Sequence, residues 1–262
     1  MIERSAAQER VATTGKYVYC IIRCAEPRQF VTRGIGERGD IIHTVHFEDL
    51  GAVVSDSPIV EYESSRRNMM AHTVVLEEVL KEWDILPVRF NTVAPSAELI
   101  QEKVLKRRYG ELHGLLKTVT GRVELGLKAF WYEQTIYNEI VAENAAIRRV
   151  RDALTGQTPD ASYYQRIQLG ELVEKAMWHK RAQEAERILT ALRPLACQAR
   201  EGKVFTDQMV LNVAFLVDKS RQDGFDEAVR TLDEELDHRL LFRYVGPVPP
   251  YNFVQITVSW KD

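Results

Sequence analysis

One stretch of this sequence has the spacing of a phosphate-binding loop. GIGERG, residues 34–39, matches Gly-x-Gly-x-x-Gly, and such a loop binds a dinucleotide when a strand precedes it and a helix opens from its last glycine. The residues that follow, DIIHTVHF at 40–47, are instead β-branched and alternate in polarity. They predict a loop between two extended segments, so we expect no nucleotide here and no other cofactor.

Two cysteines and two histidines lie close enough in the sequence to suggest a metal site. Cys20 and Cys24 are four residues apart on a predicted strand, where a rise of about 3.3 Å per residue separates them by about 13 Å. That distance is too long for two thiolates to bind one zinc ion. His43 and His46 would face opposite sides of the next strand. We therefore predict buried or half-buried cysteines and no metal site.

Glu235 and His238 have the Glu-x-x-His spacing of di-iron carboxylate sites. Such sites need a second copy of the motif and further carboxylates on neighbouring helices, which this sequence lacks. It also contains no nucleophile elbow, no Walker A loop and no His-Glu-x-x-His motif. We predict a protein without catalytic residues, and hence not an enzyme.

The composition restricts the classes of partner. The chain has 262 residues, 45% of them hydrophobic, and a formal net charge of −3, which gives no reason to expect nucleic acid or a lipid membrane as a partner. Three cysteines are too few for a disulfide framework and fit a reducing cytosol. Residues 1–15 lack the apolar core of a secretion signal, and no run approaches the roughly 18 apolar residues that span a bilayer.

Hydrophobic periodicity predicts the elements of an N-terminal unit. Strands are expected at 16–23, 40–47, 50–55 and 85–93, and helices at 64–83 and from 95 to about 117. In the first helix, Met69, Leu76 and Trp83 belong to an apolar stripe at helical spacing. These elements predict a compact α+β unit in which helices pack on strands.

A second set of elements follows. We expect strands at 121–132, 209–217, 240–245 and 254–260, and helices at about 133–154, 169–195 and 225–236. The two long helices should pair as a hairpin, although their apolar stripes could also receive a partner helix. Pro194 predicts a kink or an early end near Arg193.

The whole pattern predicts an α+β fold of two domains, with a sheet-and-helix unit first and an elaborated ferredoxin-like sheet with a long helical hairpin second. The expected division is a flexible tail at 1–15, an N-terminal domain at 16–119, a C-terminal domain at 120–245, and a proline-rich segment with the last strand and tail at 246–262.

The proline-rich segment GPVPPYNFV, residues 246–254, is the strongest candidate for a partner-binding site. Pro247, Pro249 and Pro250 lack an N–H and favour an extended, polyproline-like path. Tyr251 and Phe253 either anchor this rigid connection in the domain core or form, with the prolines, a preformed platform for another protein. The sequence leaves both alternatives open.

This segment resembles the Gly-Pro-x-Pro-Pro-Tyr-x-Phe signature of the gas vesicle protein F/L family (GvpF/GvpL), and the chain is most similar to its F-type members. Further similarity lies at YVYCII (17–22), LGAVVSD (50–56), the helix with His72, ILPVRFNTV (85–93), GRVELGLKAFW (121–131) and NVAFLV (212–217). Asn91 and Cys20 stand where the family pattern has glycine, Val248 where tryptophan is frequent, and Asn252 where serine is frequent.

The resemblance implies a non-enzymatic accessory or minor structural protein of gas vesicles, located at the vesicle shell within the cytoplasm. The expected partner is the hydrophobic shell-forming protein (GvpA type), with other gas vesicle accessory proteins as further partners. The alternative is a cytosolic ligand-sensing regulatory protein, since ferredoxin-like sheets also bind small molecules. A cavity with convergent polar groups would favour that alternative.

Overall fold

The computed structural model describes residues 14–158 and 161–260, and it divides the chain into two compact units. The first unit contains the described residues up to Gly121 together with those from Val248 onward, and the second runs from Arg122 to Pro247. The chain therefore leaves the first unit for the second and then returns to it. Residues 1–13 of the predicted tail lie outside the described residues, whereas Thr14 and Gly15 already belong to the first strand.

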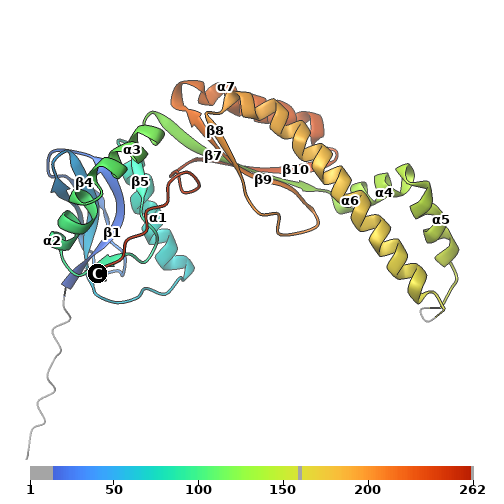
Figure 1. The fold of residues 1–262 in the computed structure, drawn as a ribbon, viewed down its shortest axis with the longest axis horizontal. Helices are drawn as coiled ribbons and strands as arrows, with labels where there is room; N and C mark the ends of the chain where they lie inside the picture. The colour runs from blue at the N-terminus through green and yellow to red at the C-terminus, as the bar shows by residue number, and fades with distance from the viewer. Residues whose placement is uncertain (1–13, 159–160, 261–262) are drawn as a thin grey trace, which may run out of the picture. The chain divides into compact units, whose positions relative to one another are not determined.

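The first unit is built on a six-stranded antiparallel sheet in the order β2-β3-β4-β1-β5, with β6 also paired to β1 (Figure 1). Its strands are β1 (Thr14–Arg23), β2 (Gln29–Arg33), β3 (Ile41–Phe47), β4 (Leu50–Pro58), β5 (Ile85–Pro87) and β6 (Val93–Ala94). GIGERG is the loop between β2 and β3, as the sequence predicts. The predicted strand at 85–93 is instead two short strands, and β2 was not predicted.

A bulge in β1 decides which side chains face which side of the sheet. The pairing of β1 with β4 shifts between Val18 and Cys20, so Cys20 lies on the same face as Tyr17 and Tyr19. Val18 and Ile21 belong to the opposite face. Cys20 and Cys24 are both buried, as predicted.

Helices cover both faces of this sheet. Helix α1 (Arg66–Leu80) packs Val75, Leu76 and Val79 against the face that carries the tyrosines. The opposite face is covered by α2 (Ala97–Leu99), the π-helical turn η1 (Ile100–Lys106) and α3 (Tyr109–Val119). Ser65 and Ser96 cap α1 and α2 at their N-termini through their hydroxyl oxygens.

The second unit has a four-stranded sheet in the order β10-β7-β9-β8. Its elements follow the chain as β7 (Arg122–Trp131), α4 (Glu133–Glu143), α5 (Ala145–Leu154), α6 (Tyr163–Leu192), η2 (Arg193–Leu195), β8 (Gln198–Glu201), β9 (Met209–Asp218), η3 (Lys219–Arg221), α7 (Gln222–Leu236) and β10 (Leu240–Val248). This β-α-β-β-α-β order with the last strand beside the first is the ferredoxin-like arrangement. The predicted fold class is confirmed.

The predicted helical hairpin is present with one interruption. Asn144 ends α4 and starts α5, because its side-chain oxygen accepts hydrogen bonds from the N–H groups of Ala146 and Ile147 at 3.1 and 3.2 Å. Both α4 and α5 pack against α6. Helix α6 ends at Leu192, before the Arg193–Leu195 turn that contains Pro194, as expected.

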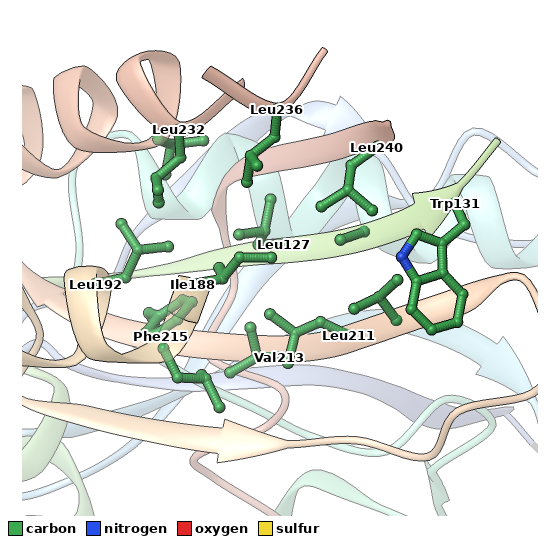
Figure 2. Close-up of a cluster of buried hydrophobic side chains, with 14 of the residues drawn as sticks. Leu127, Trp131, Ile188, Leu192, Leu211, Val213, Phe215, Leu232, Leu236 and Leu240 are labelled. Carbon is green, nitrogen blue, oxygen red and sulfur yellow. The ribbon is translucent and has the colours of Figure 1, made fainter. Parts of the chain in front are cut away.

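The core of the second unit is almost entirely apolar (Figure 2). It includes Leu127 and Trp131 of β7, Phe215 of β9, Ile188 of α6 and Leu232 of α7, with Trp131 at the opposite end from Ile188 and Leu232. Phe215 is fully buried and lies 5.0 Å from the ring of Phe225. Packing of large apolar side chains is what holds this unit together.

The strand predicted at 254–260 is wrong, and the fourth strand of the second sheet lies elsewhere in the chain. Residues 254–260 do not form a strand: Ile256 makes one parallel bridge to Val88, while Val254 and Ile256 are buried in the core of the first unit. The fourth strand of the second sheet is β8, whose four residues are all exposed. In addition, β10 continues through Pro247, which an edge strand tolerates because the missing N–H need not serve a ladder.

Candidate partner-binding cleft

The proline-rich segment contains a turn that directs the chain into the first unit. The carbonyl of Pro249 accepts the N–H of Tyr251 at 2.7 Å, and that of Pro250 accepts the N–H groups of Phe253 and Val254 at 3.1 and 3.0 Å. The predicted extended path is therefore wrong beyond Val248, where the chain turns. The turn starts what we call the C-terminal segment, residues 249–260.

The signature residues have different environments. Pro247 is exposed at the end of β10, whereas Pro249 and Pro250 are buried. Phe253 is 6% exposed and Tyr251 is 39% exposed. Phe253 therefore anchors the segment, whereas Tyr251 presents part of its side chain to solvent.

Two clefts follow the C-terminal segment within the first unit. The first cleft has a volume of 590 Å³, and its walls are α1, residues 87–90 and the C-terminal segment. Its lining residues are Met69, His72, Thr73, Pro87, Val88, Arg89, Phe90, Tyr251, Val254, Gln255, Ile256 and Thr257. The second cleft, of 720 Å³, shares Arg89, Phe90 and Thr257 with the first and extends to Trp260.

Apolar side chains continue from the first cleft onto the surface of α1. Met69 at the cleft is 50% exposed, and Met70 and Val74, one helical turn apart, are 55% and 45% exposed. Met69 was predicted to belong to the buried stripe of this helix, but the stripe consists of His72, Val75, Leu76 and Val79. Methionine side chains are flexible and polarisable, and they fit partners of varied shape. We call Met69, Met70, Val74 and Tyr251 the apolar rim.

Behind the first cleft lies a buried network of tyrosines and a histidine. The Tyr17 hydroxyl accepts the N–H of Asn91 at 2.9 Å and lies 3.1 Å from His72 Nδ1. The Tyr19 hydroxyl accepts the N–H of Ile35 at 2.8 Å. Burial raises the pKa of Tyr19 to about 12 and lowers that of His72 to about 4. His72 is therefore neutral near pH 7.

Asn91 holds the wall shared by this network and the second cleft. It has a positive φ of 68°, which asparagine tolerates better than most residues, and this agrees with the glycine that the family pattern has here. Its side-chain oxygen accepts the N–H of Tyr62 at 2.8 Å. The strained residue thus connects the loop at 62 to residues 89–92.

The other motifs that suggested chemistry have structural environments. His46 Nδ1 lies 2.9 Å from the carbonyl oxygen of Cys24, and Glu235 forms an ion pair with Arg187 at 3.2 Å. Among residues 14–158 and 161–260, no cluster of three or more potential metal ligands occurs. None of the helices in these ranges is both long and apolar enough to cross a bilayer.

Of the residues that line the candidate cleft, the sequence pointed to the C-terminal segment and missed the rest. The proline signature pointed to Tyr251, but nothing in the pattern singled out Arg89, and His72 was noted only as part of a family resemblance. Both come from elements distant in sequence from the C-terminal segment. The one available signal for the apolar rim was the adjacent pair Met69-Met70. Neighbouring residues point in different directions around a helix, so both could not belong to one narrow buried stripe.

Comparison with known proteins identifies the family. Residues 15–255 match the sequence model described as gas vesicle synthesis protein GvpL/GvpF, so the chain belongs to this family. Gas vesicle protein F of Streptomyces sp. (strain CB03234) is 31% identical over 91% of this chain and 99% of its own length.

Two solved structures share the fold over almost their whole length. The crystal structure of gas vesicle protein GvpF from Anabaena sp. PCC7120 superposes with a TM-score of 0.82 and 25% identity, covering 94% of this chain and 100% of that one. GvpF from Microcystis aeruginosa gives a TM-score of 0.78 with 25% identity, over 92% of this chain and 99% of that one. These relatives support a role connected with gas vesicles.

Proposed function

We propose that this protein is a non-enzymatic accessory or minor structural protein of gas vesicles that binds the shell-forming protein (GvpA type) and assists vesicle assembly. It acts at the vesicle shell within the cytoplasm, where other accessory proteins are further partners. The observation that carries the proposal is the apolar rim beside the first cleft, because a group of exposed apolar side chains next to a cleft is typical of a protein-binding surface.

The mechanism follows from the chemistry of such a partner. A very hydrophobic shell subunit aggregates unless its apolar surface is covered, and Met69, Met70 and Tyr251 can cover it without a fixed shape requirement. The buried residues Phe253 and Pro250 hold the turn that presents Tyr251. The protein would thus hold a subunit until it is added to the growing wall.

Co-purification tests this proposal. Full-length protein is co-expressed with the shell-forming protein, and the shell protein retained per molecule is measured for the wild type, Tyr251→Ala and Met70→Ser. Phe205→Ala is the matched control, because Phe205 is 71% exposed but belongs to the second unit. We expect each rim variant to retain several-fold less shell protein than the control. Equal retention by all variants would exclude the rim, and no retention by the wild type would contradict the function itself.

A further inference from the structure

The first cleft has a specific charge pattern. Among the described residues that line it, Arg89 is the only one with a full charge at neutral pH, and the others are apolar or neutral polar groups. Arg89 is exposed, and its guanidinium forms no hydrogen bond or ion pair with any residue that the structure describes. A guanidinium is a bidentate partner for a carboxylate. A ligand that complements this cleft is therefore apolar and carries one negative group.

The buried network determines which nitrogen of His72 carries the proton. The Tyr17 hydroxyl accepts the N–H of Asn91, and among the described residues its only other hydrogen-bond partner is His72 Nδ1, 3.1 Å away. Nδ1 is thus the one acceptor available to the hydroxyl proton of Tyr17. Neutral His72 then has its hydrogen on Nε2. His72 is 4% exposed and lines the first cleft, and in the described part of the chain Nε2 has no acceptor. An N–H donor is thus available to a ligand in the cleft.

The surroundings of the cleft point to a polypeptide and not to a small metabolite. The apolar rim extends beyond the first cleft along α1, and the second cleft continues past Arg89 and Phe90 on the other side. The two clefts, of 590 and 720 Å³, lie on either side of Arg89. A small metabolite would fill at most one of them and leave most of this surface exposed. An extended segment covers both.

We propose that the first cleft receives a carboxylate side chain carried within an apolar segment of the partner protein, with the carboxylate between the guanidinium of Arg89 and Nε2–H of His72. The inference rests on the proposed function, in which that partner is the shell-forming protein. Arg89 supplies the charge, whereas His72 supplies a neutral donor that Tyr17 positions. The apolar rim binds the residues on either side of the acidic one.

The test uses labelled peptides that tile the shell-forming protein, each acidic peptide being paired with its Glu→Gln or Asp→Asn form. Fluorescence anisotropy measures their dissociation constants for full-length wild type, Arg89→Gln and Arg66→Gln. Arg66 is the matched control because it is an exposed cation on α1 that does not line the cleft. We expect one acidic peptide whose binding weakens roughly tenfold with Arg89→Gln and with its amide form, with little further loss when both are combined.

His72 is tested separately as a donor. His72→Phe should weaken the same peptide several-fold, while His72→Gln, which keeps an N–H donor, should bind more tightly than His72→Phe, with circular dichroism confirming that both fold. Nitrogen-15 NMR of the wild type should show the Nε2–H tautomer of His72. A Nδ1–H tautomer, or equal binding by the two variants, would overturn this assignment.

The remaining outcomes separate the inference from the proposed function. Equal binding of the acid and amide peptides, or equal effects of Arg89→Gln and Arg66→Gln, overturns the carboxylate site while retention of the shell protein leaves the function intact. Competition by free N-acetylglutamate at the peptide's own concentration overturns a polypeptide occupant. If the shell protein is not retained and no peptide binds, the function and the site both fail.

Discussion

The two units of this protein have cores of different chemistry. In the first unit, one face of the sheet buries Tyr17, Tyr19 and His72. The Tyr17 hydroxyl is hydrogen-bonded to His72, and the Tyr19 hydroxyl accepts the N–H of Ile35. In the second unit the core consists of aliphatic and aromatic side chains, and the charged groups of Arg239 and Glu139 pair near its surface at 2.6 Å.

The difference indicates where specificity is located. A fully satisfied buried polar network fixes side-chain geometry. In the first unit this network lies directly behind the cleft, so in the proposed complex it positions His72 for the ligand. The second unit has an apolar core that stabilises the fold without such a constraint. We infer that the first unit carries the site and that the second is chiefly a packed scaffold.

The largest expected effect is a loss of packing in the second unit. Phe215→Ala removes a fully buried ring, and large-to-small changes of this kind cost about 3–5 kcal/mol of unfolding free energy. Chemical denaturation, with hydrogen exchange of β9 to locate the effect, measures it. Val31→Ala, at a site 87% exposed, is the control. A loss below about 1 kcal/mol would contradict a tightly packed core.

The network of the first unit should respond to loss of a single oxygen. Tyr17→Phe keeps the ring but leaves the N–H of Asn91 without its acceptor and His72 Nδ1 without its donor. An unsatisfied buried polar group costs about 1–3 kcal/mol, so we expect a loss of about 2 kcal/mol in urea denaturation. An unchanged midpoint and slope would show that the network contributes nothing to stability.

Lowering the pH should destabilise the first unit because His72 is buried in its neutral form. Burial lowers the pKa of His72 from 6.5 to about 4, so the unfolded chain takes up a proton first as the pH falls. Stability is therefore complete above pH 6.5 and decreases until the pH reaches about 4. Between pH 7 and 5 this group should remove about 1.5 kcal/mol, a loss that His72→Gln lacks. Parallel pH profiles of the two proteins would contradict the assignment.

A smaller effect of pH on stability, at lower pH, is expected from Asp49 in the turn before β4. Burial acts to raise the pKa of Asp49, but hydrogen bonds from Tyr109, Arg23 and His113 outweigh it and hold the pKa well below its usual range. This carboxylate therefore stabilises the fold above pH of about 4, and the contribution is lost at lower pH. Asp49→Asn should cost about 1 kcal/mol at pH 7, allowing for solvent screening.

The pH profile of the same variant completes that test. The difference between Asp49→Asn and the wild type should shrink as the pH falls below about 4, because Asp49 of the unfolded wild type then takes up a proton while the folded carboxylate is still ionised, and the wild type loses stability. Thermal unfolding measures it, and Asp152→Asn is the control, since the exposed carboxylate of Asp152 pairs with the neighbouring Arg151 alone among the described residues. A difference that persists undiminished in acid would show that the charge of Asp49 is not responsible.

Periodicity predicted the elements that bury a side-chain stripe. It found β1, β3, β4, β7 and β9 and most helices because burial on one or both faces leaves a pattern in the sequence. It missed β8, whose four residues are all exposed. It misread 254–260, where alternation comes from burial of Val254 and Ile256 in the core without a ladder.

The candidate site was less predictable than the fold. The prolines of residues 246–254 announced a rigid segment, so Tyr251 and Phe253 could be named before their environments were known. Arg89 belongs to no periodic pattern, and His72 is one position of the buried stripe of α1. Only the fold brings the two residues to one cleft. Which nitrogen of His72 is protonated depends on Tyr17 and Asn91, far away in sequence.

The most direct test of the account is site-specific photo-cross-linking during vesicle assembly. A benzophenone amino acid is placed at Met70 on the apolar rim, and in separate proteins at Val31 of the first unit and Phe205 of the second, all three being exposed. Adducts are identified by mass spectrometry. The account predicts adducts with the shell-forming protein from position 70 and few from positions 31 and 205. Equal or stronger adducts from either control position would contradict it.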